Sequence, residues 1–412
     1  MLSKFYNFVL YKLIFRNLTQ NFRYLFFSRI TINSATQLMG LFLPIFLYQF
    51  MGMSILMVLV YYLIIDVLYA SFVVTSCKQV MNRFGIKRSL QVSVLFGATY
   101  YLILFTINHY LPLNDDIFKL EKALFLLPAL FFSLSFRLTH WIPFHTNLAK
   151  LTDRGIRARQ LSLMEATMMA LGAVMPIVAG IILENLGYGY LFIIAISVYI
   201  LSLLPFSLLP KVEEKFSWDY KKTFKTLFSK KMRPSVIAYM GDGAESVVGT
   251  IIWPIFIWQL LEGNYFQVGL ISSLIIAVTI LMQFLIGRPL DKMENKQKVL
   301  RYGTLFYSFG WVLKALIGSA FQVFLFSTYH NLSRVFSRTS FDALNYDIAA
   351  DQGQYVDEYT VVRETAILFG KILMAIFVII ILPYFALRHV FLLAALASLM
   401  MSFLKKVDSF EQ

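Results

Sequence analysis

Ionisable side chains interrupt several long apolar runs of this 412-residue sequence. A charge near the centre of a lipid bilayer costs about 2.5–3.5 kcal/mol on insertion scales, so such a side chain is expected to face a polar space or a partner. Asp66 lies near the middle of one run, with Tyr62 and Tyr69 at i−4 and i+3 on the same helical face. We interpret Asp66 either as a proton-carrying acid or as a neutral acid hydrogen-bonded to a tyrosine.

Polar side chains also form stripes at helical spacing in the runs 25–49 and 234–261. Such stripes are expected to line a polar space inside the protein, because lipid would not solvate them. Arg29 begins the first stripe near its end, where it could also be an interfacial anchor. The candidate lining residues are Asn33, Gln37, Asp242, Glu245 and Trp253, of which Asp242 and Glu245 are further proton-carrying candidates.

Two other runs carry arginine and histidine at helical spacing. The candidates there are Arg137, His140, His330, Arg334 and Arg338. Guanidinium groups in a polar interior can bind an anionic group in a bidentate manner. His140 and His145 are five residues apart and point in different directions, with no thiol or carboxylate to complete a cluster, so we expect no metal site.

The composition excludes several classes of protein. With 58% hydrophobic and 15% charged residues, the chain is too apolar for a soluble protein of this size and too apolar to be disordered. The net charge of +14 comes from basic residues between the apolar runs, so we expect no nucleic acid partner. No phosphate-binding glycine loop and no convergent nucleophile and base are present, so we expect neither a cofactor nor an enzyme.

The apolar runs predict an all-α polytopic membrane protein of about twelve transmembrane helices. A hydrocarbon core about 30 Å thick needs about 20 apolar residues per helix. Runs of that length recur at 25–49, 53–77, 88–108, 121–145, 160–184, 189–209, 234–261, 265–287, 299–318, 320–345, 361–385 and 388–404. We divide the chain into an N-terminal segment 1–24, a six-helix bundle 25–210, a linker 211–233, a second six-helix bundle 234–405 and a tail 406–412.

Lys and Arg gather in alternate loops, which predicts the orientation of the chain in the membrane. The basic loops span 78–88, 150–159, 211–233 and 288–301, and the loops between them lack Lys and Arg near Gly52, Leu186 to Gly189, Gly263 and Gly318. We therefore expect an integral protein of the cell (inner) membrane with both termini in the cytoplasm. The linker could lie on the membrane as an amphipathic helix or be a solvated connection.

The two halves share sequence features in the same order, which indicates a duplication. Pro44, Ile45, Phe46 and Gln49 recur 210 residues later as Pro254, Ile255, Phe256 and Gln259. Asn82 and Arg83 are matched by Asp291 and Lys292, and Glu165 by Glu364.

Two six-helix halves joined by a long basic linker resemble the major facilitator superfamily (MFS), and the resemblance covers essentially the whole chain. The loop after the second helix of that family runs Gly-x-x-x-Asp-Arg/Lys-x-Gly-x-Arg/Lys-Arg/Lys. The matching residues here are Asn82, Arg83, Gly85, Lys87 and Arg88 in the first half and Gly287, Asp291 and Lys292 in the second. Lys78 and Asn82 replace the family's first Gly and its Asp, and Glu294 stands in place of the second Gly.

The resemblance implies a secondary transporter that works by alternating access, binds a small solute in the bilayer and is usually a monomer. Proton coupling is open. Gly172 to Gly180 is similar to the Gly/Pro-rich helix of exporters, although close helix packing explains it as well. We prefer export of an amphipathic compound. The alternatives are uptake or exchange of a polar or anionic solute, such as a sugar or organic acid, and a non-transporting sensor or scaffold.

Charged residues near the basic end are candidates for gating. We expect Glu165 and Glu364 to pair with the basic loop motifs near Arg83 and Lys292. The basic loop 150–159 and the acidic segment 342–358 would attract each other when the cytoplasmic side closes. Exposed pairs are worth about 0–1 kcal/mol each, so only a network would bias this equilibrium.

Overall fold

The computed structural model describes residues 18–52, 54–111, 120–152, 156–212, 218–290, 296–350 and 356–405. Every regular element in these ranges is a helix. The first half contains α2 (Gln20–Gly40), α3 (Leu43–Phe50), α4 (Ile55–Tyr110), α5 (Leu120–Leu151) and α6 (Arg157–Leu208), and α7 (Tyr220–Leu227) follows in the linker. The second half contains α8 (Arg233–Val247), the π-helix η1 (Val248–Ile252), α9 (Trp253–Leu260), α10 (Tyr265–Leu290), α11 (Lys296–Ala315), α12 (Ala320–Ala350), α13 (Val356–Ile381), η3 (Leu387–His389), α14 (Val390–Met400) and η4 (Met401–Phe403).

Two glycines divide the longest helices into pairs of membrane spans. The apolar part of α6 has 49 residues, which at about 1.5 Å per residue is more than twice the thickness of the hydrocarbon core. It turns back at Gly187, where φ is 78°, and α4 turns at Gly85, where φ is 72°. Glycine adopts this left-handed conformation without the steric cost of a Cβ. Gly85 of the loop motif therefore makes the turn near the start of the second span, 82–110, which follows the span 55–80.

The repeated Pro-Ile-Phe sequence marks a bend in the first helix of each half. Pro44 and Pro254 stand in the first turns of α3 and α9, where the missing N–H costs little. The preceding helix is interrupted in both places, because α2 meets α3 at an angle of 42° and α8 passes through η1 before α9.

By length and apolar composition alone, seven described helices can cross a membrane, or eight if α2 and α3 form one bent span. Three further helices are less apolar or shorter: α11 and α12 carry charges within their apolar stretches, and α14 has 11 residues. Once α4 and α6 are each divided at their glycine, the helices correspond one to one with the twelve predicted runs. The predicted fold class is confirmed.

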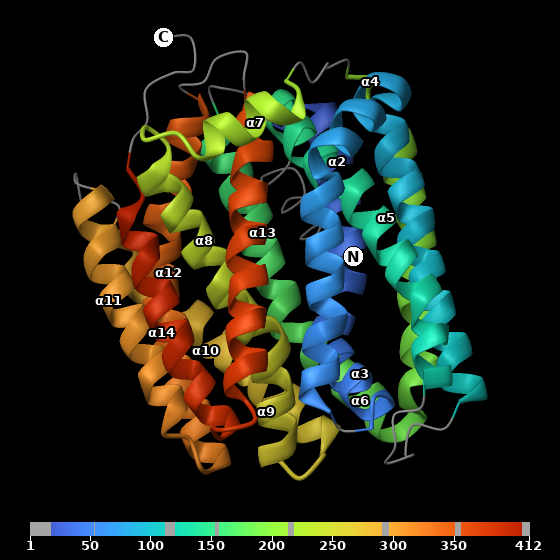
Figure 1. Ribbon diagram of the computed structural model, residues 1–412, viewed down its shortest axis with the longest axis vertical. Helices are drawn as coiled ribbons and strands as arrows, with labels where there is room; N and C mark the ends of the chain where they lie inside the picture. Colours follow the sequence, from blue (N-terminus) through green and yellow to red (C-terminus); the bar gives the residue numbers. More distant parts are fainter. Residues whose placement is uncertain are drawn as a thin grey trace, which may run out of the picture.

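The helices pack as two bundles (Figure 1). In the first bundle α4 packs on α5 and α6, and α2 on α6; in the second, α11 packs on α12 and α14, and α8 on α13 and α14. The bundles meet where α10 packs against α6 and α13 against α4. These contacts leave α2, α5, α8 and α12 to carry the polar stripes between the bundles.

The Gly/Pro-rich segment of α6 lies at one of these contacts. A Cβ on Gly269 of α10 would lie 2.3 Å from the carbonyl oxygen of Pro176, and a Cβ on Gly180 would lie 2.7 Å from that of Tyr265. Ser273 Oγ accepts a hydrogen bond from the backbone N–H of Ile177 at 3.0 Å. The small residues therefore allow α6 and α10 to approach closely.

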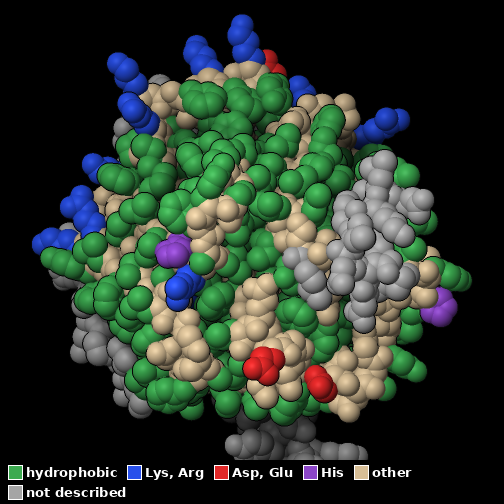
Figure 2. Space-filling model, turned by 60° about the horizontal axis from the view of Figure 1, so that its bottom comes forward, with side chains coloured by type: hydrophobic (Ala, Val, Ile, Leu, Met, Phe, Trp, Pro, Cys, Tyr) green, Lys and Arg blue, Asp and Glu red, His purple; other side chains and the backbone are tan. Residues whose placement is uncertain are grey.

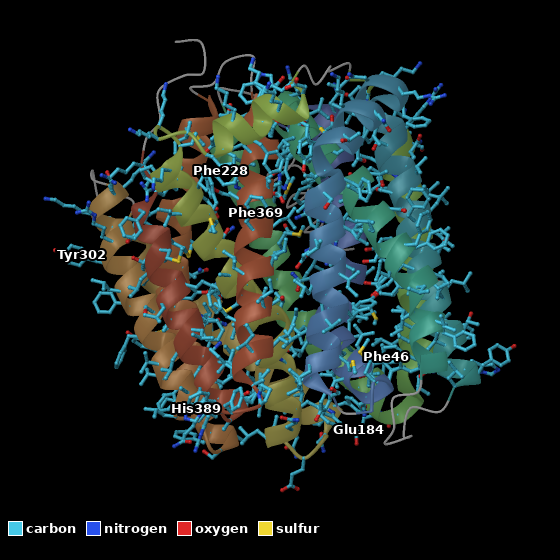
Figure 3. All side chains as sticks on the ribbon, in the orientation of Figure 1. Phe46, Glu184, Phe228, Tyr302, Phe369 and His389 are labelled. Atoms are coloured by element: carbon cyan, nitrogen blue, oxygen red, sulfur yellow. The ribbon has the colours of Figure 1, made fainter. Side chains whose placement is uncertain are left out.

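The ends of the bundles away from the basic loops are joined by two reciprocal hydrogen bonds, here called the glutamine contacts. Tyr265 donates to Gln49 Oε1 and Gln259 donates to the Tyr48 hydroxyl, each at 2.7 Å. The two glutamines are equivalent positions of the internal repeat. Figure 3 shows Phe46 and Glu184 at this end of the first bundle.

The face of the molecule shown in Figure 2 is largely apolar and is here called the apolar belt; Lys and Arg lie mostly along its upper and left edges, here called the basic rim. Large side chains such as Phe131 and Leu204 are more than half exposed. Such a surface on an all-helical protein is suited to lipid. At the basic end α7 packs onto α13, where Phe224 and Phe228 contact the ring of Phe369 (Figure 3).

Candidate functional site

Asp66 and Arg137 form an ion pair inside the first bundle. Arg137 Nη1 of α5 donates to Asp66 Oδ1 of α4 at 2.7 Å. The two side chains are 21% and 7% exposed. Tyr62 and Tyr69 stay within electrostatic range of this pair, as their spacing predicted, but arginine and not tyrosine is the direct partner of Asp66.

A second ion pair lies in the other bundle. Arg338 of α12 donates to Asp242 Oδ1 of α8 at 2.5 Å and to Asp342 Oδ2, one turn further along α12, at 3.1 Å. Arg338 and Asp342 are 34% and 38% exposed, so solvent reaches this pair. Sequence reasoning selected Asp242 and Arg338 separately and missed the pairing in both bundles.

Arg334 stands one helical turn from Arg338 and is exposed. It has no hydrogen bond or ion pair with any residue that the structure describes. Its electrostatic neighbours are Tyr307, Glu245, Arg338 and Asp242, all from the second bundle. An exposed arginine among these charged groups is suited to a polar space between the bundles, because lipid contacts would leave its charge unsolvated.

Charges of the two bundles face each other between α6 and α12. Glu165 of α6 is exposed, and its electrostatic neighbours are Asp342, Arg29 and Arg338. The pairing of Glu165 with the basic loop motifs near Arg83 and Lys292 stays a prediction, since Lys292 lies outside the described residues; the charges around Glu165 belong to the central stripes. Together with Arg334, these residues form a surface of both signs, here called the interbundle charges: Arg29, Glu165, Asp242, Arg334, Arg338 and Asp342.

Glu364 and its neighbour Arg363 lie on α13, opposite the first bundle. Their side chains are 3.5 Å apart and mostly buried. Glu364 is within electrostatic range of Tyr69 of α4, and Arg363 of His145 of α5. Arg363 was not selected from the sequence, where it is one basic residue at the start of a long apolar run.

Within electrostatic range of Arg334 lies a group here called the lysine cluster: the buried side chains of Glu245, Tyr307, Lys314, His330 and Trp311, with the half-buried Trp253. The Lys314 ammonium lies 3.9 Å from the ring centre of Trp253 and 4.4 Å from that of Trp311. Tyr307 donates to Glu245 Oε1 at 2.7 Å. The ring of His330 lies 4.6 Å from those of Tyr307 and Trp311. Lys314 and Tyr307 were missed because neither belongs to a polar stripe in the sequence.

Three predicted lining residues have other surroundings. His140 is buried between Phe136 and Phe144 and shares a hydrogen bond with Ser93 Oγ at 3.0 Å. Asn33 donates to Met168 Sδ of α6, and Gln37 lies near Gly172 of the same helix. His140 is thus part of the interior of the first bundle.

The loop motif of the first half lies at the turn of α4. Arg83 and Arg88 are exposed on the basic rim, Lys87 is half-buried, and Asn82 starts the second span of α4. In the second half Gly287 belongs to the last turns of α10. Asp291 and Lys292 lie outside the described residues, as do the side chains needed to test attraction between the loops at Arg157 and Asp351.

The described residues hold no group of three or more His, Cys, Asp or Glu arranged to bind a metal ion. Their polar groups are instead ion pairs, hydrogen bonds and cation–π contacts between helices. Such an arrangement is suited to binding a charged or dipolar molecule and to moving protons.

No protein-family model matches the chain, and no curated protein matches its sequence. Solved structures match its fold. One is the crystal structure of a POT family transporter in complex with a thioalcohol-conjugated peptide, at TM-score 0.71 and 12% identity, covering 94% of this chain and 97% of that one. Another is a POT family transporter in complex with 5-aminolevulinic acid, at TM-score 0.67 and 12% identity, with the same coverage. POT transporters belong to the MFS, so the likeness establishes the MFS fold.

Proposed function

We propose that this chain, which has the fold of MFS transporters, is a secondary transporter that works by alternating access. Three features support the proposal: the apolar belt, the two bundles in contact through α4, α6, α10 and α13, and the interbundle charges. In such a mechanism the bundles rock about a solute site near the midplane. The likeness in fold covers nearly the full length of both chains, which favours a transporter over a sensor or an enzyme.

The solute that fits the interbundle charges carries a negatively charged group. The observation that carries this proposal is Arg334, which is exposed and has no ion-pair partner among the described residues. A guanidinium in this setting binds a carboxylate or phosphate strongly, because no direct ion pair with a described residue occupies it. Glu165 and Asp342 lie near each other across the bundles and could hold an amine. A small zwitterion could bind Arg334 through its carboxylate and Glu165 and Asp342 through its amine.

The ligands named for the two solved structures are a peptide conjugate and 5-aminolevulinic acid, whose name denotes an amine and a carboxylic acid. These ligands were bound by those two proteins, and they are the first solutes to test with this chain. Uptake or exchange of a polar, charged solute therefore replaces our preference for export of an amphipathic compound. The Gly172 to Gly180 segment gives no support to export, because its Pro176 and Gly180 form the contact with α10.

The remaining features belong to the same proposal. Both termini lie in the cytoplasm, since the basic rim marks the cytoplasmic side by the distribution of Lys and Arg. The functional unit is a monomer in the cell membrane, divided at the linker 211–233.

Solute binding to purified protein tests the proposal. Thermal unfolding would be followed with 5-aminolevulinic acid, dialanine and an uncharged sugar, in wild type, Arg334→Gln and the control Arg301→Gln. Arg301 is exposed near the start of α11 and is not among the electrostatic neighbours of Glu165, Arg334 or Arg338. We expect the zwitterions to raise the melting temperature of wild type and of Arg301→Gln, but not of Arg334→Gln. Stabilisation by the sugar alone, or equal stabilisation of both variants, would exclude the proposed site.

A further inference from the structure

Two of the three acids proposed to carry protons are held by arginine. Asp66 is paired with Arg137 at 2.7 Å and Asp242 with Arg338 at 2.5 Å. A guanidinium does not lose its proton in proteins and stabilises the ionised carboxylate. Both aspartates are therefore suited to positioning helices or solute, and less suited to exchanging a proton during each cycle.

Glu245 differs from these aspartates because its direct partner is neutral. Its carboxylate accepts a hydrogen bond from Tyr307, and it is only 6% exposed. Its charged neighbours are Lys314, Arg334 and Arg338, at electrostatic range. The buried negative charge of Glu245 thus depends on three cations, of which Lys314 alone can lose its proton.

Lys314 is the removable cation. It is 4% exposed, and among the described residues its ammonium has cation–π contacts with Trp253 and Trp311 but no hydrogen bond and no direct ion pair. Indole faces attract a cation without binding its proton, so deprotonation breaks no hydrogen bond. A buried lysine, unlike an arginine, readily exists in the neutral form.

We propose that Lys314 is the proton carrier of this protein, with Glu245 as its fixed counter-charge, and that proton binding to Lys314 is coupled to binding of an anionic solute group at Arg334. The step is the transfer of one proton between the Lys314 amine and water that enters beside Arg334; no other bond forms or breaks. This inference rests on the proposed function for the solute, but the proton site itself does not.

The coupling follows from charge. Without solute, Arg334 compensates Glu245 and repels the ammonium of Lys314, as both lie within its electrostatic range. A carboxylate bound at Arg334 neutralises that guanidinium, so Lys314 takes up a proton to restore the balance. By linkage, proton binding strengthens anion binding by the same factor. The outcome is entry of one proton with each anionic group.

The charged and titratable groups near Lys314 on the surrounding helices are Glu245 of α8 and His330 and Arg334 of α12, and Tyr307 of α11 donates a hydrogen bond to Glu245. His330 is the other side chain that could titrate here; its Nδ1 is buried and without a hydrogen-bond partner among the described residues. The test must therefore separate the lysine from the histidine.

Tryptophan fluorescence offers a readout that needs no solute, because Lys314 touches two of the five tryptophans. We would titrate purified protein with pH and compare wild type with Lys314→Met, Lys314→Arg, His330→Gln and the control Lys371→Met on α13. Unlike Lys314→Met, Lys314→Arg keeps a positive charge beside Glu245, so a misfolded protein is less of a concern with this variant.

We expect a pH transition in wild type, His330→Gln and Lys371→Met, and its loss in both Lys314 variants. Adding 5-aminolevulinic acid should move the transition to higher pH in wild type but not in Arg334→Gln. A transition that persists in Lys314→Arg, or disappears in His330→Gln, overturns the lysine assignment. A transition that depends on Lys314 but ignores every solute overturns the coupling and the proposed solute class, while the proton site stands.

Discussion

The glutamine contacts join the bundles at the end away from the basic rim, and removing them should favour opening at that end. The change is Gln49→Leu together with Gln259→Leu, which keeps side-chain size while removing both hydrogen bonds to Tyr265 and Tyr48. Leucine can neither accept nor donate a hydrogen bond, so the state in which these ends are closed loses stability relative to the open state.

The expected size follows from the hydrogen bonds. Each net hydrogen bond is worth about 1 kcal/mol, so both together contribute about 2 kcal/mol. Since about 1.4 kcal/mol is a tenfold change, the equilibrium should shift roughly 30-fold toward opening. Gln49 is 9% exposed whereas Gln259 is exposed, so Gln49→Leu should cause the larger part of the effect.

Distances between spin labels in the two bundles measure this equilibrium. Labels would be placed through Leu186→Cys and Tyr384→Cys in a Cys77→Ala background, because Cys77 is the single cysteine. Both label sites are more than half exposed. The double leucine variant should show a larger fraction of long distances than wild type.

Gln322→Leu is the matched control, since Gln322 accepts only from the backbone N–H of Gly318 in its own bundle. Its distance distribution should equal that of wild type. An unchanged distribution in the double variant, or an equal change in Gln322→Leu, would refute the idea that the glutamine contacts hold this end closed.

Two further predictions concern packing and charge. Asp66→Asn should destabilise the protein by about 3 kcal/mol, which is the lower end of the range for a broken buried pair because Arg137 is partly exposed. Adding Arg137→Gln should recover most of this loss, as measured by thermal unfolding. A double variant no more stable than Asp66→Asn would contradict the pairing. Gly269→Ala should force α10 away from the Pro176 carbonyl and widen the distances between the same spin labels. Gly172→Ala should leave these distances unchanged, because its Cβ would meet its nearest neighbour at 3.7 Å. Equal behaviour of the two alanine variants would exclude close helix contact as the reason for glycine at position 269.

Much of the fold could be predicted because lipid imposes strong constraints on sequence. Apolar length fixed the number of spans, and the repeat of Pro44 and Gln49 at Pro254 and Gln259 indicated two similar halves. The same constraint explains why α11 was harder to place by composition: Lys314 lies in its apolar stretch and is stabilised by rings from α9 and α11 that no local pattern reveals.

The candidate site was predicted residue by residue but not pair by pair. Helical spacing selected Asp66, Arg137, Asp242 and Arg338, because each interrupts an apolar run. Which acid meets which arginine depends on how α4 faces α5 and α8 faces α12, and these are contacts between residues 71 and 96 positions apart. The place of Glu165 beside Asp342 likewise depends on how the bundles face each other.

The central claim is transport of a charged solute through the space lined by the interbundle charges, and solute counterflow tests it most directly. Proteoliposomes would be loaded with unlabelled 5-aminolevulinic acid or dialanine, diluted into labelled solute, and compared for wild type, Arg334→Gln and protein-free vesicles. We predict transient accumulation of label with wild type and a loss of at least about tenfold in Arg334→Gln, as expected when about 1.4 kcal/mol or more of binding is removed. Label uptake no greater than in protein-free vesicles for both solutes, or equal uptake by Arg334→Gln, would contradict the account.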